Sequence, residues 1–416
     1  MSLGIEAYNL VTKFESFSPH RTGGVGNQQV IDWLTNYLKA SSWKVHLDDF
    51  SYQHYEGKFK SQTYNIDGML LYYSVLGKGK IENPLFFRLD DGMESYLTNS
   101  SNLHELEVLI IQKLVSDAQL SGYDGLILES ISKSEHLSAI NSHNAYDLNF
   151  PIILVDKKTF NYIGNKKDIS ISYEASVVKN HSSNILATCN VRKNESPFVI
   201  TTPMSGWFSC AGERGCGISI ALLVAREIAK YHYVDLIFAN GHELGYRGAY
   251  KFVESYKKKP KAVLHLGSCL ANKKTELIGT CYSNNFKDIS DNLAKLGILA
   301  QSPDDNVSEN EWVGESKCWA AKNAPMLSVA GTNPYFHTKA DVTSSVTSPA
   351  LLDRFIKSLS KAAHSLLMNS FTILALKRVN FFSISLTNDI FVCKSAKFLT
   401  LSLRNVKSLY KSSLNS

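Results

Sequence analysis

The stretch VDLIFANGHELGYRGAYKFVES, residues 234–255, is predicted to form a buried strand, a tight turn and a helix in direct succession. Residues 234–238 are almost entirely apolar, and glycines at positions 241 and 245 mark the turn. A strand followed at once by a helix is the repeating unit of a parallel sheet. Polar residues just after such a strand lie where open α/β sheets place their chemistry.

The same alternation continues on both sides of this stretch. Two N-terminal helices, over 5–14 and 28–40, lead into a strand at 43–47. We therefore predict an α/β fold, a mostly parallel sheet sandwiched by helices. The further strands expected in it are 198–201, 262–266 and 326–329, and the further helices are 218–229, 289–296 and 349–367.

The region from 63 to 179 has a different composition, in which short strand-like runs dominate around one helix at 105–120. We predict three parts: an α/β domain made of 1–62 and 180–370, a β-rich domain inserted at 63–179, and a basic tail at 371–416. The strands expected in the inserted domain are 69–73, 84–88, 125–129, 151–155 and 169–173.

The positive charge is concentrated at the C-terminal end. The chain of 416 residues has a formal net charge of +6. Residues 371–416 contain seven basic residues and one acidic residue, and 7 − 1 = +6 is the whole excess. The rest of the chain is neutral by the same count, which argues against nucleic acid as a partner of the folded core.

Cysteines and apolar runs indicate a cytoplasmic protein. The seven cysteines are scattered and form no C-x-x-C pair, so neither a disulfide framework nor a structural zinc knot is expected. The N-terminus lacks a basic segment followed by an apolar run, and no apolar stretch is long enough for a transmembrane segment.

Four loops or strands each offer a residue that could bind a metal ion: Glu213, the pair His242 and Glu243, His265, and His337. Taken singly, each has an ordinary structural explanation. A loop carboxylate is commonly solvated or placed near a helix N-terminus, and a histidine on an apolar strand is more often a hydrogen-bonded core residue. The His-Glu pair is not the helical H-E-x-x-H motif, because Tyr246 stands in place of the second histidine.

The order of these loops resembles the zinc aminopeptidase family, which includes bacterial leucine aminopeptidases, glutamate carboxypeptidase and, as a non-enzymatic member, the transferrin receptor. The resemblance spans roughly residues 5–368. It implies a zinc-exopeptidase-like α/β fold in which the inserted β-rich part is a protease-associated domain. Three segments carry it: AGERGCG at 211–217 resembles the family's Ala-Asn-Asp-Asn-x-x-Gly loop, GHELGYRGA at 241–249 its Gly-Glu-Glu-x-Gly-x-x-Gly-Ser turn, and YFHTKAD at 335–341 its Tyr-x-His-x-x-x-Asp segment.

The resemblance implies roles for individual positions. In the family two zinc ions share a bridging aspartate, and a glutamate acts as the general base. Glu213 stands at the bridging position, Glu243 and His337 at the ligand positions of one zinc, and His242 at the position of the base. The other zinc has lost its ligands, since Pro203 and the region near Gly267 stand where its histidine and aspartate would be, and Ser205 replaces the supporting aspartate.

What remains suits a single zinc ion. Glu213, Glu243 and His337 would give three protein ligands and one open position, the pattern of a catalytic zinc that lowers the pKa of its bound water to about 7. His242 could accept the proton, because imidazole titrates near neutral pH, or it could be a fourth ligand that closes the site. His265 could partly rebuild the site or merely pack there.

The sequence is compatible with three functions. The first is a metallopeptidase-like hydrolase of aminopeptidase type, acting on a peptide or small amide with one zinc ion or an altered zinc site. The second is a catalytically inactive member of the family that serves as a binding or interaction protein. The third is a single-zinc acyl-transfer enzyme resembling glutaminyl cyclase, which keeps a carboxylate base where this chain has His242.

Overall fold

The computed structural model describes residues 2–88, 103–130, 132–141, 148–166, 168–189, 195–304 and 307–376. Residues 1–372 form one compact unit. The tail predicted at 371–416 lies outside the described residues from position 377 onward. Within the described residues, no helix is long and apolar enough to cross a membrane.

A nine-stranded sheet forms the centre of the larger domain, in the order β1-β7-β9-β8-β10-β13-β11-β12, with β3 also paired to β7. Its middle is parallel, as expected: β9 (Val234–Ala239), β8 (Phe198–Pro203), β10 (Ala262–Leu266) and β13 (Met326–Thr332) run side by side in one direction. These strands are the four predicted from apolar runs. The predicted α/β class is therefore confirmed.

The edges of the sheet are antiparallel or short, and the two strands at the β12 edge were not predicted. Strand β11 (Glu276–Tyr282) runs antiparallel to β13, and β12 (Leu299–Gln301) pairs with β11. Strand β11 is buried only over Gly279–Cys281, where two of the three residues are glycine and threonine, and its remaining residues are exposed or partly exposed. Its apolar signal is therefore weaker than that of a strand buried on both faces.

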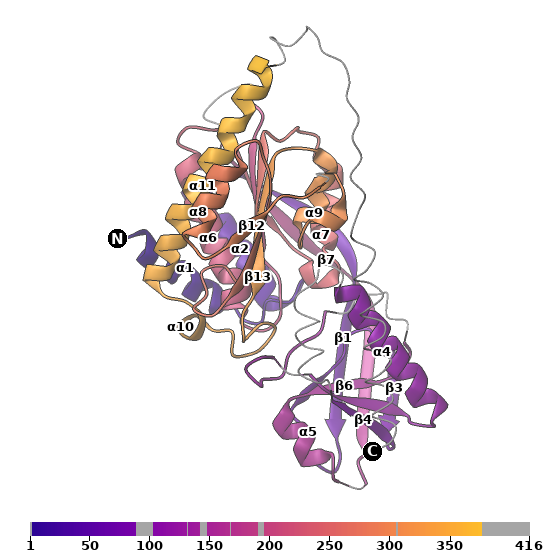
Figure 1. Cartoon of the computed structure of the whole chain (residues 1–416). Coiled ribbons are helices and arrows are strands. Elements are labelled where there is room, and N and C mark those ends of the chain that lie inside the picture. Colours follow the sequence, from indigo (N-terminus) through magenta and orange to yellow (C-terminus); the bar gives the residue numbers. More distant parts are fainter. Residues whose placement is uncertain are drawn as a thin grey trace, which may run out of the picture. The chain divides into compact units, whose positions relative to one another are not determined.

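Two long strands join the larger domain to the insert. Strand β1 (Lys44–Ser61) pairs antiparallel with β7 (Ile171–Cys189) in unbroken register over the whole length of β1. The short strands predicted at 43–47 and 169–173 are the ends of these longer ones. Figure 1 shows the two strands running from the main sheet into the inserted part. We call this pair the β1–β7 ribbon.

Helices cover both faces of the sheet (Figure 1). One face packs against α1 (Leu3–Glu15), α2 (Val25–Ala40), α6 (Cys216–Ile228), α8 (Phe286–Ala294) and α11 (Pro349–Leu376), and the other against α7 (Arg247–Ser255) and α9 (Ser316–Trp319). The strands supply both cores because successive side chains point to opposite faces. On β8, for example, Phe198 and Ile200 enter the first core and Val199 enters the second. A short helix, α10 (Thr343–Val346), precedes α11.

The inserted part has its own four-stranded sheet, in the order β2-β6-β5-β4. The residues of it that the structure describes form two helices and two separate apolar cores, one of which contains Tyr55 from the β1–β7 ribbon. The boundaries 63 and 179, and the protease-associated nature of this part, remain predictions. Its elements are β2 (Gly68–Leu70), β3 (Gly77–Ile81), β4 (Pro84–Arg88), α4 (Leu103–Leu120), β5 (Gly125–Glu129), β6 (Ile152–Val155) and α5 (Lys157–Ile163).

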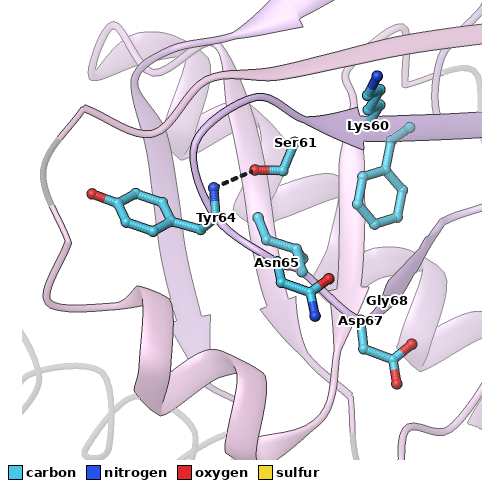
Figure 2. A pocket seen from close by; sticks show the side chains of 8 residues that line it. Lys60, Ser61, Tyr64, Asn65, Asp67 and Gly68 are labelled. Carbon is cyan, nitrogen blue, oxygen red and sulfur yellow. Dashed lines mark hydrogen bonds between the residues drawn. The ribbon is translucent and has the colours of Figure 1, made fainter.

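An open pocket of about 340 Å³ lies where β1 ends and the chain turns into β2. Figure 2 shows its lining, which comes from residues 59–61 and 64–68, with the backbone N–H of Tyr64 donating to the hydroxyl of Ser61. None of the residues predicted to carry chemistry lines this pocket.

A buried histidine makes the fold sensitive to acid. His20 is fully buried and stacks on Phe14, with ring centroids 3.9 Å apart. Burial lowers the pKa of His20 to about 3. Because the unfolded chain takes up this proton near pH 6.5 and the folded chain does not, stability is full above pH 6.5 and is lost progressively as the pH falls toward 3.

We therefore expect His20 to cost about 2 kcal/mol of unfolding free energy between pH 7 and pH 5. Urea denaturation at the two pH values measures this loss. His20→Leu keeps an apolar side chain against Phe14 but cannot titrate, so its stability should change less over the same range. An equal pH dependence in the variant and in the wild type would contradict this assignment.

Candidate functional site

The four parallel strands bring the predicted residues to one edge of the sheet. The carboxyl ends of β8, β9, β10 and β13 lie side by side because these strands are neighbours and run in the same direction. The loops after β8, β9 and β13 carry Glu213, the His242–Glu243 pair and His337, and His265 is the penultimate residue of β10. This is the edge at which open α/β sheets bind ligands.

A π-helical turn over Ala211–Gly215 presents Glu213 and begins α6. The carboxylate of Asp341 holds the turn in place, accepting hydrogen bonds of 2.9 Å from the backbone N–H groups of Gly212 and Glu213. Only a glycine fits at position 212, because an added Cβ would lie 2.2 Å from Oδ1 of Asn272 and 2.6 Å from Oδ1 of Asp341. Burial raises the pKa of Asp341 to about 7, and the two N–H donors oppose that rise.

Arg214 directs its guanidinium into the interior of the site. The side chain has no exposed surface, and Nε donates to the backbone carbonyl of Ser205 at 2.8 Å. Nη2 lies 2.7 Å from Oε1 of Glu213, and Nη1 donates to the backbone carbonyl of Glu213 at 3.5 Å. Neighbouring residues of one turn thus form a fully buried ion pair.

Glu213 contacts a second basic group through the same oxygen. Nε2 of His337 lies 3.3 Å from Oε1 of Glu213. Burial raises the pKa of the carboxyl, but Arg214 and His337 outweigh burial and lower it to about 2. Glu213 is therefore ionised throughout the physiological pH range. Its Oε2 is buried and accepts no hydrogen bond from any group that the structure describes.

The inserted part helps to fix His337. Nδ1 of His337 lies 2.9 Å from the backbone carbonyl of Ala139, and the N–H of Ala139 donates to the carbonyl of His337 at 2.9 Å. The residue adopts a left-handed backbone conformation with φ of +57°, which is uncommon outside glycine and recurs at functional sites. Because a carbonyl oxygen can only accept, Nδ1 of His337 carries a hydrogen and donates it to Ala139, and Nε2 faces the carboxylate of Glu213.

Glu243 forms a different set of contacts from Glu213. It lies in a 3₁₀ turn, His242–Leu244, between Gly241 and Gly245, whose φ angles of +78° and +69° explain why glycines flank it. One carboxylate oxygen accepts from the N–H of Thr22 at 2.6 Å, and the other accepts from the hydroxyl of Ser205 at 2.9 Å. The glycine-rich turn after α1 thus closes over this carboxylate.

His242 contacts Glu315, a residue that was not predicted to belong to the site. Its Nδ1 lies 2.5 Å from Oε1 of Glu315, which immediately precedes α9. The other carboxylate oxygen of Glu315 lies 3.6 Å from Nε2 of His265, whose Nδ1 contacts the hydroxyl of Ser328 at 2.8 Å. Burial raises the pKa of Glu315, but His242 and His265 outweigh it and hold the pKa well below its usual range. The carboxylate therefore links both histidines.

The structure thus divides the predicted residues into separate contacts. Glu213 and His337 are in contact, whereas the oxygens of Glu243 accept hydrogen bonds from Thr22 and Ser205. His265, for which both rebuilding and packing were open, is fully buried beside Glu315. Two contacts were not predicted from the sequence: that of Arg214 with Glu213, and that of Glu315 with the two histidines. A sign of the first was available, because a cation directly beside a proposed metal-bridging carboxylate competes with the metal.

These contacts do not fit the predicted zinc ion. Zinc needs deprotonated ligands that converge on one point, usually four in number. Among the residues that the structure describes, no group of three or more His, Cys, Asp or Glu side chains is arranged to hold a metal ion. The oxygen of Glu213 that faces His337 is also the oxygen that Arg214 contacts. The ligand set Glu213, Glu243 and His337 remains a prediction.

The central parallel strands, the helices on both faces and the loops at one sheet edge define the α/β fold of zinc exopeptidases. Comparison with solved structures confirms this class. A zinc aminopeptidase from Bacillus subtilis matches with a TM-score of 0.68 and 14% identity, over 87% of this chain and 94% of that chain. The resemblance predicted from the sequence motifs is thus confirmed at the level of the fold.

Two further solved structures agree. An aminopeptidase from Aneurinibacillus sp. strain AM-1 matches with a TM-score of 0.58 and 16% identity, over 87% of this chain and 93% of that chain. A peptidase M28 precursor from Shewanella amazonensis SB2B matches with a TM-score of 0.64 and 13% identity, over 88% of this chain and 95% of that chain. No family model and no curated protein matches the sequence.

Proposed function

We propose that the protein is a peptidase-type hydrolase that acts on a peptide or small amide, with His242 as the general base. The observation that carries the proposal is the contact between Nδ1 of His242 and Oε1 of Glu315. It orients an imidazole at the position where the family that this chain resembles has its base. The fold shared with solved aminopeptidases supports the substrate class.

The chemistry of the pair follows from its donors and acceptors. An ionised carboxylate can only accept, so Nδ1 of His242 carries the hydrogen and Nε2 of the neutral ring carries the lone pair. Nε2 can then take a proton from a water molecule that attacks the amide carbonyl carbon, and it returns this proton to the leaving amine as the C–N bond breaks. Glu315 stabilises the imidazolium between the two proton transfers. The side chain of His242 retains 12% of its accessible surface, and that of Glu315 only 2%. In this mechanism the histidine faces the substrate and the glutamate holds it from behind.

Zinc enters none of these steps, because the side chains of the predicted set are already engaged with one another and with Arg214, Thr22 and Ser205. The proposal of a zinc-dependent aminopeptidase and that of a single-zinc cyclase both require a rearrangement of these contacts.

A direct test is hydrolysis of a panel of aminoacyl-arylamides by the purified chain, with and without added zinc. We expect release of the arylamine from at least one substrate, and we expect purified His242→Ala to release it at least about 10²-fold more slowly. A folded wild-type protein that cleaves neither these substrates nor a mixture of unmodified peptides would refute hydrolysis.

A second candidate is a non-catalytic member of the same fold that binds peptides. The buried ion pair between Glu213 and Arg214 favours it, because it occupies the carboxylate that a metallopeptidase would need. Equilibrium dialysis with the same unmodified peptides, followed by mass spectrometry, separates the two candidates. Saturable binding with every peptide recovered intact supports the binding protein, and cleaved peptide supports the hydrolase.

A further inference from the structure

We propose that the guanidinium of Arg214 is the resident cation of this site, standing where the similar zinc aminopeptidases use a metal ion, so that the site is complete without zinc. The proposal depends on the contacts of Arg214 and holds whether or not the chain hydrolyses peptides. Three observations carry it: the burial of the cation, the oxygens it occupies, and the way the turn is built around it.

The first observation is complete burial. Arg214 has no exposed surface, so its charge is not solvated by bulk water and must be balanced by protein groups. Glu213 supplies the nearest negative charge at 2.7 Å. A guanidinium stays protonated at any pH at which proteins fold, so this positive charge is permanent. A divalent cation beside it would meet strong repulsion in a poorly screened interior.

The second observation concerns the oxygens. Oε1 of Glu213 is shared between Nη2 of Arg214 and Nε2 of His337, at 2.7 and 3.3 Å. A zinc ion bound by both Glu213 and His337 would have to lie between these two side chains, where Arg214 already contacts the same carboxylate oxygen. The guanidinium also reaches the backbone carbonyl of Ser205 through Nε. Ser205 lies in the segment where the resemblance places the histidine ligand of the other zinc ion. One side chain thus contacts both halves of the expected metal centre.

The third observation is the local backbone. Glu213 and Arg214 lie on a π-helical turn, preceded by Cys210 with φ of +31°. A π-turn is a rare arrangement that occurs frequently at functional sites, and a left-handed residue other than glycine carries a conformational cost. The carboxylate of Asp341 stabilises this turn by accepting hydrogen bonds from the backbone N–H groups of Gly212 and Glu213. In this turn the side chains of the consecutive residues Glu213 and Arg214 contact each other instead of pointing apart.

The experiment compares the wild type with Arg214→Ala. Both proteins are dialysed against a chelator, incubated with a small excess of zinc chloride and passed through a desalting column. Zinc per chain is then measured by inductively coupled plasma mass spectrometry. The thermal midpoint of each protein is recorded with and without zinc, because a ligand that binds only the folded state raises that midpoint. The matched control is Arg226→Ala, which removes an exposed arginine that pairs with Glu6.

We expect the wild type and Arg226→Ala to retain no stoichiometric zinc and to show no zinc-dependent change in thermal midpoint. Arg214→Ala is expected to gain zinc, because Glu213 and His337 are freed of the cation, and its thermal midpoint should rise when zinc is added. Stoichiometric zinc in the wild type would overturn the proposal, as would a folded Arg214→Ala protein that binds no more zinc than the wild type. If Arg214→Ala does not fold, the zinc content of the wild type decides alone. None of these readouts requires peptide hydrolysis.

Discussion

Arg214→Met is expected to lower the free energy of unfolding by about 3–5 kcal/mol, the typical cost of removing one partner from a buried ion pair. The reason is the group that remains. The carboxylate of Glu213 has no exposed surface and would lose the cation 2.7 Å from it, keeping only His337 at 3.3 Å. Methionine fills much of the volume of the arginine stem, so the loss reports the charge more than a cavity. Urea denaturation at pH 7 measures it.

Two further variants isolate the charge. Arg226→Met removes a guanidinium that makes two hydrogen bonds to Glu6 at a partly exposed position, and we expect it to cost less than about 1 kcal/mol. The double variant Glu213→Gln, Arg214→Met removes both charges of the buried pair and should recover a good part of the loss. If the single and double variants are equally destabilised, the side-chain volume of Arg214 matters rather than its charge.

His242→Ala is expected to reduce kcat/KM by about 10²- to 10⁴-fold on any arylamide that the wild type cleaves, the usual contribution of a general base. The loss should lie mainly in kcat, because the imidazole takes a proton in the transition state rather than holding the substrate. His46→Ala provides the control, since His46 is an exposed histidine on β1. Steady-state kinetics on the three proteins, with circular dichroism to confirm folding, gives the comparison.

Glu315→Gln tests whether this residue positions His242. The glutamine oxygen can still accept from Nδ1, so the ring orientation is retained, but the imidazolium loses its neighbouring negative charge. We expect an intermediate loss of kcat and a shift of the acid limb of the pH–rate profile toward lower pH, because protonation of the base becomes less favourable. If Glu315 had only a structural role, Glu315→Gln would lower the yield of folded enzyme and would leave the pH–rate profile unchanged.

Much of the fold could be predicted from apolar runs. The four parallel strands are buried on both faces, so residues such as 262–266 are nearly continuous apolar sequence, and their helices follow within short loops. The full length of the β1–β7 ribbon could not be predicted from apolar runs. Along β1 the pattern of exposed and buried side chains changes from one segment to the next, and polar residues such as Lys58 and Lys60 fall within it. Pairing with β7, which is more than a hundred residues away, fixes this strand.

The site was predictable only where a residue follows a strand. Glu213, His242 and His337 lie in loops after parallel strands, and the topology of the sheet brings such loops together. Glu315 precedes a four-residue helix, and nothing in its neighbourhood marks it before the fold is known. The partners of Glu243 also depend on tertiary structure. Thr22 precedes it by 221 positions, and sequence spacing cannot show that the two are hydrogen-bonded.

The β1–β7 ribbon limits how the inserted part could be removed or exchanged. Each residue of β1 has a fixed partner on β7, for example Tyr55 opposite Val177, and side chains alternate between faces. A deletion that shortens only one strand by a single residue would turn every later side chain of that strand to the opposite face. A functional transplant must therefore cut both strands at paired positions and keep the parity of each. Because Ala139 of the insert binds His337, the recipient would also have to supply a substitute for that loop.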